Sequence, residues 1–183
     1  MAESPTCTES LGSLNLLWFD PDELFRGGFR NVASEVENFF RKIGVKAVWN
    51  SAAGVEEDGQ VVVFVILIPH PPSGWRLRDD VVGAAPGVGG PRRFAYVFPP
   101  RIMRALGREF STDEADLVAP NAELVKSTSR ITIHEIIHAV APTHRHSSGG
   151  LMKASQGRDA WLEDEVLLDE TCRRAFLSAL ATF

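Results

Sequence analysis

Cysteine is scarce in this chain of 183 residues, which contains only Cys7 and Cys172. Two cysteines are too few for a disulfide framework, although this pair could join the N-terminus to the last predicted helix. Basic residues are not in excess either, because 19 Lys and Arg stand against 24 Asp and Glu and leave a net charge of −5. This mild acidity argues against a protein that binds nucleic acid, which usually has a basic patch, and against one that binds an anionic membrane surface.

Long apolar segments are also missing. The longest apolar run, residues 61–68, has eight residues, whereas a helix that spans a membrane needs about 20. The first ten residues contain Glu3 and Glu9 and neither Lys nor Arg, so they do not predict a signal peptide. The sequence is therefore compatible with a cytoplasmic protein or with the mature part of an exported one, and it leaves the oligomeric state open.

Four stretches are predicted to be β-strands because they are apolar and bounded by turn residues: 14–19, 45–51, 61–68 and 93–98. Stretch 61–68 is apolar throughout, which predicts a central strand covered on both faces. Stretch 93–98 is stopped by Pro99 and Pro100 and is therefore a candidate edge strand. Between these two lies a long loop, residues 69–91, rich in Gly and Pro, and long loops in compact domains are usually functional or mobile.

Three helices are predicted from apolar residues spaced three and four apart, at about 20–43, 121–141 and 162–180. The first begins at Asp20, which can cap the helix before Pro21 in its first turn, and Gly44 is a natural stop. The second ends before Pro142. Its last part is apolar on nearly every side, which is typical of a helix buried at the centre of a domain.

An H-E-x-x-H segment lies inside this second helix and consists of His134, Glu135 and His138. Residues four apart stand one turn apart on the same helix face, so both imidazoles can reach one metal ion. Burying two histidines and a glutamate in an apolar helix without partners is costly, and a bound metal removes that cost. So short a pattern also occurs by chance, but in this context it predicts a zinc site.

A catalytic zinc ion needs a third protein ligand and keeps one position for water. Four of the five histidines of the chain fall within 13 residues, because His144 and His146 follow the helical pair closely. Both are therefore candidates for the third position.

The sequence from His134 to Met152, HEIIHAVAPTHRHSSGGLM, resembles the metzincin clan of zinc endopeptidases. The pattern of that clan is H-E-x-x-H-x-x-G-x-x-H followed by a methionine-bearing turn. The resemblance implies that His144 is the third ligand, with Met152 eight residues later, as in the matrixin branch. In such a turn the methionine forms an apolar floor under the metal and is not a ligand.

The sequence departs from the clan pattern at the end of the helix. Ala141 stands where the pattern has Gly, and Pro142 follows it. Gly normally allows the sharp turn that ends this helix, so the chain must leave the helix with another geometry. The alternative third ligand is therefore His146, two residues after His144, and of the two we favour His144.

The resemblance implies an α+β fold of the metzincin-like zincin type, in a small, bacterial-type member of the clan. This fold has a twisted, mostly parallel β-sheet, an active-site helix and a C-terminal helix. It implies one catalytic domain over residues 1–183. The N-terminal lobe, 1–141, would hold the sheet and two long helices, and the small C-terminal lobe, 142–183, would hold the Met-turn and the last helix.

The implied function is that of a zinc-dependent metalloendopeptidase, in which Glu135 acts as general base for a metal-activated water. A protein or peptide substrate would bind extended along an edge strand, here 93–98. One alternative is a gluzincin-type zinc peptidase with Glu165 as its third ligand. The other is a zinc-containing binding module without peptidase activity, against which Glu135 argues because a purely structural site needs no general base.

Overall fold

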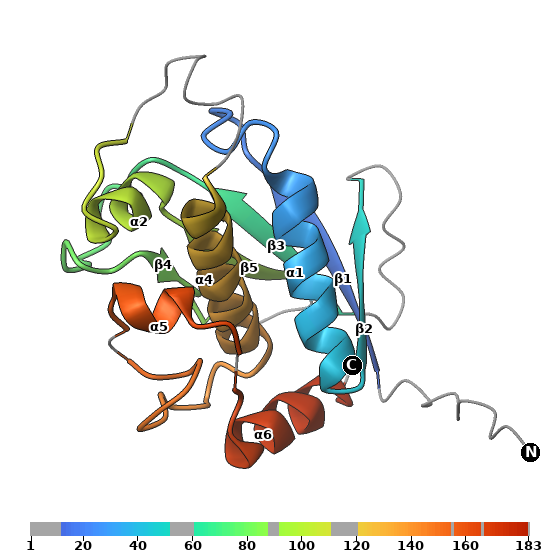
Figure 1. Ribbon diagram of the computed structural model, residues 1–183. Coiled ribbons are helices and arrows are strands. Elements are labelled where there is room, and N and C mark those ends of the chain that lie inside the picture. The colour runs from blue at the N-terminus through green and yellow to red at the C-terminus, as the bar shows by residue number, and fades with distance from the viewer. Residues whose placement is uncertain are drawn as a thin grey trace, which may run out of the picture.

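The computed structural model describes residues 12–51, 61–87, 92–110, 121–154, 156–165 and 167–182. Five strands form one sheet in the order β2-β1-β3-β5-β4 (Figure 1). Their bounds are β1 Gly12–Phe19, β2 Val45–Asn50, β3 Val61–Leu67, β4 Gly83–Ala84 and β5 Arg92–Val97. All neighbouring strands are parallel except β4, which runs antiparallel to β5. The fold is therefore a mixed helix and sheet fold with a mostly parallel sheet.

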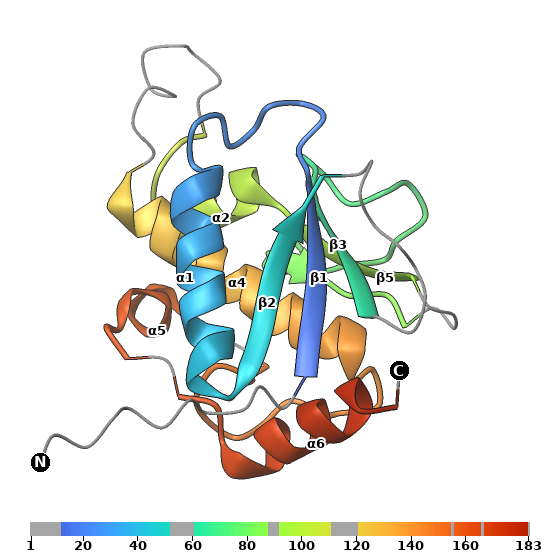
Figure 2. The same cartoon turned by 90° about the vertical axis from the view of Figure 1, so that its right-hand side faces the viewer.

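Strand β3 stands at the centre of the sheet, as its apolar sequence predicts. Val63, Val65 and Leu67 are fully buried on the face where α1 (Phe29–Lys42) and α4 (Ala122–Val140) lie, as Figures 1 and 2 show. Successive side chains of a strand point to opposite faces, so Phe64 and Ile66 point to the other face, where they are only half-buried. Both faces are therefore covered, but the second face less completely than the face that packs against α1 and α4.

Helix α1 begins nine residues later than predicted, at Phe29 instead of Asp20. Both carboxylate oxygens of Asp20 accept hydrogen bonds, from the backbone N–H groups of Leu24 at 2.8 Å and Phe25 at 2.9 Å. Asp20 thus closes a turn instead of capping a helix. The chain cannot be helical here because Gly27 has a φ of +75°, which lies outside the right-handed helical region.

Helix α4 follows the prediction for residues 121–141 closely and is confirmed by the structure. Asn121 caps it, because its side-chain oxygen accepts a hydrogen bond from the backbone N–H of Glu123 at 2.9 Å. Nearly all residues of its last three turns are buried. The helix ends at Val140, two residues before Pro142. This is expected, because proline has no backbone N–H to continue the helical hydrogen bonds.

The last helix, predicted at about 162–180, is helical only from α6 (Glu170–Leu180) onward, and a separate short helix, α5 (Arg158–Leu162), ends where the predicted one was to begin. Asp169 interrupts the pattern because its side chain caps α6, accepting a hydrogen bond from the backbone N–H of Cys172 at 2.9 Å. A short helix, α2 (Pro99–Ala105), was not predicted. Pro99 and Pro100 follow the end of strand β5 and begin α2. A proline suits the first turn of a helix.

The candidate edge strand, 93–98, corresponds to β5, and this prediction is wrong. β5 lies inside the sheet, between β3 and β4. The edge is β4, which pairs Gly83 with Val97 and Ala84 with Tyr96. It belongs to the long loop predicted for residues 69–91, where its small residues carried no strand pattern.

One hydrophobic cluster extends through the described part of the chain and includes residues from α1, α4, α6 and the strands. Phe176 of α6 packs against Phe40 of α1 with ring centroids 5.5 Å apart, and both rings are fully buried. The segment after α4 thus packs into the same core as the sheet. Among the described residues, no helix has the length and apolar character needed to cross a membrane. Cys7 lies outside the described residues.

Candidate metal centre

Three histidines converge at the C-terminal half of α4. His134 and His138 stand one turn apart on the helix, and His146 comes from the loop that follows. Their candidate ligand nitrogens all lie within 4.8 Å of one another, and the Nε2 atoms of His138 and His146 are 3.1 Å apart. We call these residues the histidine triad.

The spacing within the triad fits a shared zinc ion. With Zn–N bonds of about 2.0–2.1 Å and tetrahedral angles, two ligand nitrogens lie roughly 3.3 Å apart. The separation of 3.1 Å between His138 Nε2 and His146 Nε2 is close to this value. Imidazole nitrogen is also a ligand that zinc prefers. The donor set and its geometry therefore suit zinc.

A hydrogen bond fixes which nitrogen of His134 can serve as a ligand. Nδ1 lies 2.8 Å from the backbone carbonyl oxygen of Leu151. A carbonyl can only accept, so Nδ1 carries the hydrogen and donates, and Nε2 keeps its lone pair for a metal. Hydrogen bonds of this kind orient metal-binding histidines and raise their basicity.

Burial keeps the helical pair neutral. Desolvation lowers the pKa of His134 to about 4 and that of His138 to about 3. For His138, the nearby His134 and His146 lower the pKa further. A neutral imidazole is the form that binds a metal, so at neutral pH both side chains are in the state that ligation requires.

Glu135 lies beside the triad but is not part of it. Its side chain is 7% exposed, and burial raises its pKa to about 8. The carboxyl group lies directly under β4, because a Cβ added at Gly83 would stand 2.8 Å from both Cγ and Oε1 of Glu135. A carboxyl with a pKa near neutrality can both accept and return a proton, which is the property expected of a general acid and base.

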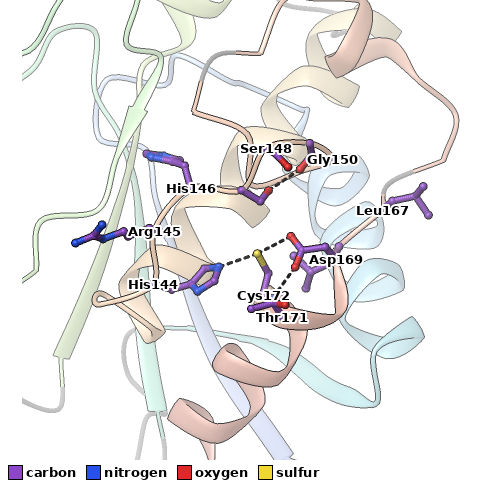
Figure 3. A pocket seen from close by; sticks show the side chains of 12 residues that line it. His144, Arg145, His146, Ser148, Gly150, Leu167, Asp169, Thr171 and Cys172 are labelled. Atoms are coloured by element: carbon purple, nitrogen blue, oxygen red, sulfur yellow. Dashed lines mark hydrogen bonds between the residues drawn. The ribbon is translucent and has the colours of Figure 1, made fainter.

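His144 does not join the helical pair, although it was the favoured third ligand. Its Nε2 lies 2.7 Å from Sγ of Cys172 on α6. Figure 3 shows its ring directed at that sulfur, with the ring of His146 turned away. The cause is the way the chain leaves α4: the backbone N–H of His144 donates to the carbonyl of Ala141 at 3.0 Å. This turn aims His144 at α6 and returns His146 towards the helix.

Glu165, the third ligand of the gluzincin alternative, is not in the group of candidate ligands found among the described residues. It is exposed and lies in the non-helical stretch between α5 and α6. The helix α6 begins only after Asp169, so Glu165 does not stand on it.

Met152 is fully buried behind a tight turn. Its carbonyl accepts a hydrogen bond from the backbone N–H of Ser147 at 2.8 Å. The turn requires glycine at position 150: φ is +65°, and an added Cβ would stand 2.6 Å from the carbonyl oxygen of Leu167. The same turn brings the Leu151 carbonyl to His134, so the segment that carries Met152 also orients a triad histidine.

Sequence reasoning missed the contact between β4 and Glu135. Gly83 and Ala84 are small residues inside a loop rich in Gly and Pro, and no alternation of apolar and polar residues marks them as a strand. The pairing depends on β5, which supplies the partner residues Val97 and Tyr96. No local signal could have placed this strand over the glutamate.

Comparison with known proteins gives a likeness in structure alone. No protein-family model matches the chain, and no curated protein sequence matches it. Archaemetzincin from Methanopyrus kandleri aligns over 98% of this chain and 99% of its own, with a TM-score of 0.57 and 15% sequence identity. The two chains share a fold. A zinc-dependent peptidase from Methanocorpusculum labreanum aligns over 89% of this chain and 99% of its own, with a TM-score of 0.48 and 16% identity.

Proposed function

We propose that the protein is a zinc-dependent metalloendopeptidase of the metzincin type. The observation that carries the proposal is the histidine triad, with the buried Glu135 next to it and a raised pKa on that carboxyl group. The fold shared with an archaemetzincin supports it. The ligands are His134, His138 and His146, with His146 in place of the initially favoured His144.

A zinc ion held by the triad would polarise a peptide carbonyl and lower the pKa of water to about 7. The proton is carried by a side chain of the protein, that of Glu135. Glu135 takes a proton from the attacking water and passes it to the nitrogen of the leaving amine. Its burial favours this cycle, because a carboxylate kept from solvent is a stronger base than an exposed one.

We propose that the substrate binds as an extended chain along β4. Among the described residues β4 pairs with β5 alone, so its other edge is the end of the sheet. Extended peptides bind to such edges through backbone hydrogen bonds. Gly83 lies directly against Glu135, so a peptide paired with β4 would pass close to the proposed base. This assignment replaces stretch 93–98 as the substrate-binding edge.

We further propose that Met152 serves as the methionine of a metzincin Met-turn. The support is its complete burial and the turn that precedes it. The chain around Met152 also provides the carbonyl that orients His134. An apolar side chain at this point keeps water from the buried side of the ligands.

Metal analysis of three variants tests the ligand set. We expect zinc bound in a 1:1 ratio by the wild type, lost in His146→Ala and retained, with weaker affinity, in His144→Ala. Glu165→Ala should bind zinc as the wild type does, because Glu165 is exposed and outside the triad. Zinc lost from His144→Ala and kept by His146→Ala would reverse the assignment, and zinc lost from Glu165→Ala would favour the gluzincin alternative.

The variant Glu135→Gln separates an enzyme from a zinc-containing binding module. Glutamine keeps the size of the side chain but cannot accept the proton. General bases contribute about 10²–10⁴-fold to rate, so cleavage of a peptide library should fall by that factor with zinc content unchanged. The binding-module alternative would gain if the zinc-loaded wild type cleaved no peptide in the library.

A further inference from the structure

A chain of polar side chains links the loop after α4 to the start of α6. Nε2 of His144 lies 2.7 Å from Sγ of Cys172, and that thiol donates to Oδ2 of Asp169 at 2.8 Å (Figure 3). Because the thiol hydrogen points to Asp169, the Nε2–H of His144 donates to the sulfur. We call these three side chains the anchor. They lie in the wall of a cavity of ≈ 750 Å³ beside the triad histidine His146.

The anchor is held firmly on the α6 side. Cys172 is 1% exposed and packs in the hydrophobic core. Asp169 uses both oxygens, since Oδ1 accepts from the backbone N–H of Cys172 at 2.9 Å while Oδ2 accepts from its thiol. Burial and the nearby Asp169 raise the pKa of the thiol to about 12, so it stays protonated and remains a donor at neutral pH.

On the loop side, the anchor holds His144, which stands two residues before His146. Ser147 follows His146 directly, and its hydroxyl donates to the carbonyl oxygen of Gly149 at 2.5 Å. The pKa of Asp169 lies below its usual value because the thiol and backbone N–H of Cys172 donate to it, with a smaller effect of the Ser147 hydroxyl. His144 therefore ties the chain just before the exposed His146 to the buried Cys172 of α6.

His146 needs such support more than the other triad histidines do. His134 and His138 stand on a buried helix, which fixes their positions. His146 is exposed and belongs to a loop, tied on its far side by the bond from Ser147 to Met152. A ligand that moves must be ordered when the metal binds, and this cost lowers affinity. A loop that is already held in position before the metal binds avoids this cost.

We infer that Cys172 and Asp169 are positioning residues for the metal centre, which hold His144 so that His146 stands beside the helical pair. The inference rests on the proposed function, since it takes His146 to be a zinc ligand. It also assigns a role to His144, which is then an anchor and not a ligand.

Zinc affinity of the full-length protein tests this inference, measured by competition with a coloured chelator. Loss of supporting contacts around metal ligands typically costs about 10–100-fold in affinity. We expect Cys172→Ala and His144→Ala to weaken zinc binding by about tenfold or more on this basis. Cys172→Ser should restore most of the affinity, because a hydroxyl can accept from His144 and donate to Asp169.

Asp169→Asn is a second variant, which keeps an oxygen to cap α6 but replaces the acceptor that faces the thiol. We expect it to weaken zinc binding as Cys172→Ala does. Phe176→Leu is the matched control: it lies on the same helix and is fully buried, but its side chain takes no part in the hydrogen bonds of the anchor. This control should lower the free energy of unfolding and leave zinc affinity unchanged.

The outcomes separate this inference from the proposed function. Wild-type affinity in Cys172→Ala and Asp169→Asn would overturn the positioning role while leaving the ligand set intact. Equal weakening in Phe176→Leu would also overturn it, because stability alone would then explain the loss. Absence of zinc binding in the wild type would instead reject the proposed function. Zinc binding by His146→Ala with none by His144→Ala would make His144 the ligand and so overturn this inference as well.

Discussion

The contact between β4 and the proposed base predicts a severe effect of the smallest possible change, Gly83→Ala. The added Cβ would stand 2.8 Å from each of three atoms: Cγ and Oε1 of Glu135 and Cγ2 of Ile131. Carbon atoms pack comfortably at about 3.5–4.0 Å. Since α4 is buried on most of its surface, β4 must move away from Glu135 by roughly 0.7–1.2 Å to restore normal contact.

Two magnitudes follow from this displacement. A misplacement of about 1 Å between a substrate and a catalytic group can cost about 100-fold in rate, so kcat/KM should fall by about that factor. Overpacking typically lowers the free energy of unfolding by about 1–3 kcal/mol. Zinc content should not change, because the atoms nearest the added Cβ belong to Glu135 and Ile131 and not to the triad.

Peptidase activity, zinc content and denaturant unfolding of the purified variant check these values, with Gly87→Ala as the matched control. Gly87 lies in the same loop, and its added Cβ would meet Pro142 at an ordinary distance of 3.6 Å. Neither glycine has a positive φ, so alanine is allowed by the backbone at both positions. Wild-type activity of Gly83→Ala, or an equal loss in Gly87→Ala, would refute the placement of β4 over the proposed catalytic centre.

Two further predictions concern stability. Burial raises the pKa of Glu135 from 4.5 to about 8, so over this pH range the folded state of the chelator-treated protein holds a proton that the unfolded state has released. The wild type should therefore lose stability relative to Glu135→Gln as pH rises from 4.5 to about 8. A difference between their free energies of unfolding that stays constant across this range would contradict the burial of the carboxyl group. Phe40→Ala should lower the free energy of unfolding by about 3–5 kcal/mol, because this fully buried ring packs against Phe176; a loss below about 1 kcal/mol would show that α6 does not share the core.

Much of the fold could be predicted from local sequence patterns. The bounds of α4 follow from the cap at Asn121 and from Pro142, and the central position of β3 follows from its continuous apolar run. The errors at the helix ends arose where an aspartate accepts hydrogen bonds from backbone N–H groups three to five residues later, an arrangement that serves a turn as well as a helix cap. Asp20 has the form of a helix cap but closes a turn, and Asp169 interrupts a helical pattern by capping a new helix.

The candidate metal centre likewise has one part that the sequence predicted and one part that it left open. The sequence by itself determined His134, Glu135 and His138 as one unit, because residues one turn apart on a helix meet whatever surrounds them. Only the tertiary structure decided which of His144 and His146 stands beside them. That choice depends on how the chain leaves α4 and on a contact between His144 and Cys172, 28 residues further along. No periodicity within a segment encodes such a contact, since it exists only after α6 has packed against the core.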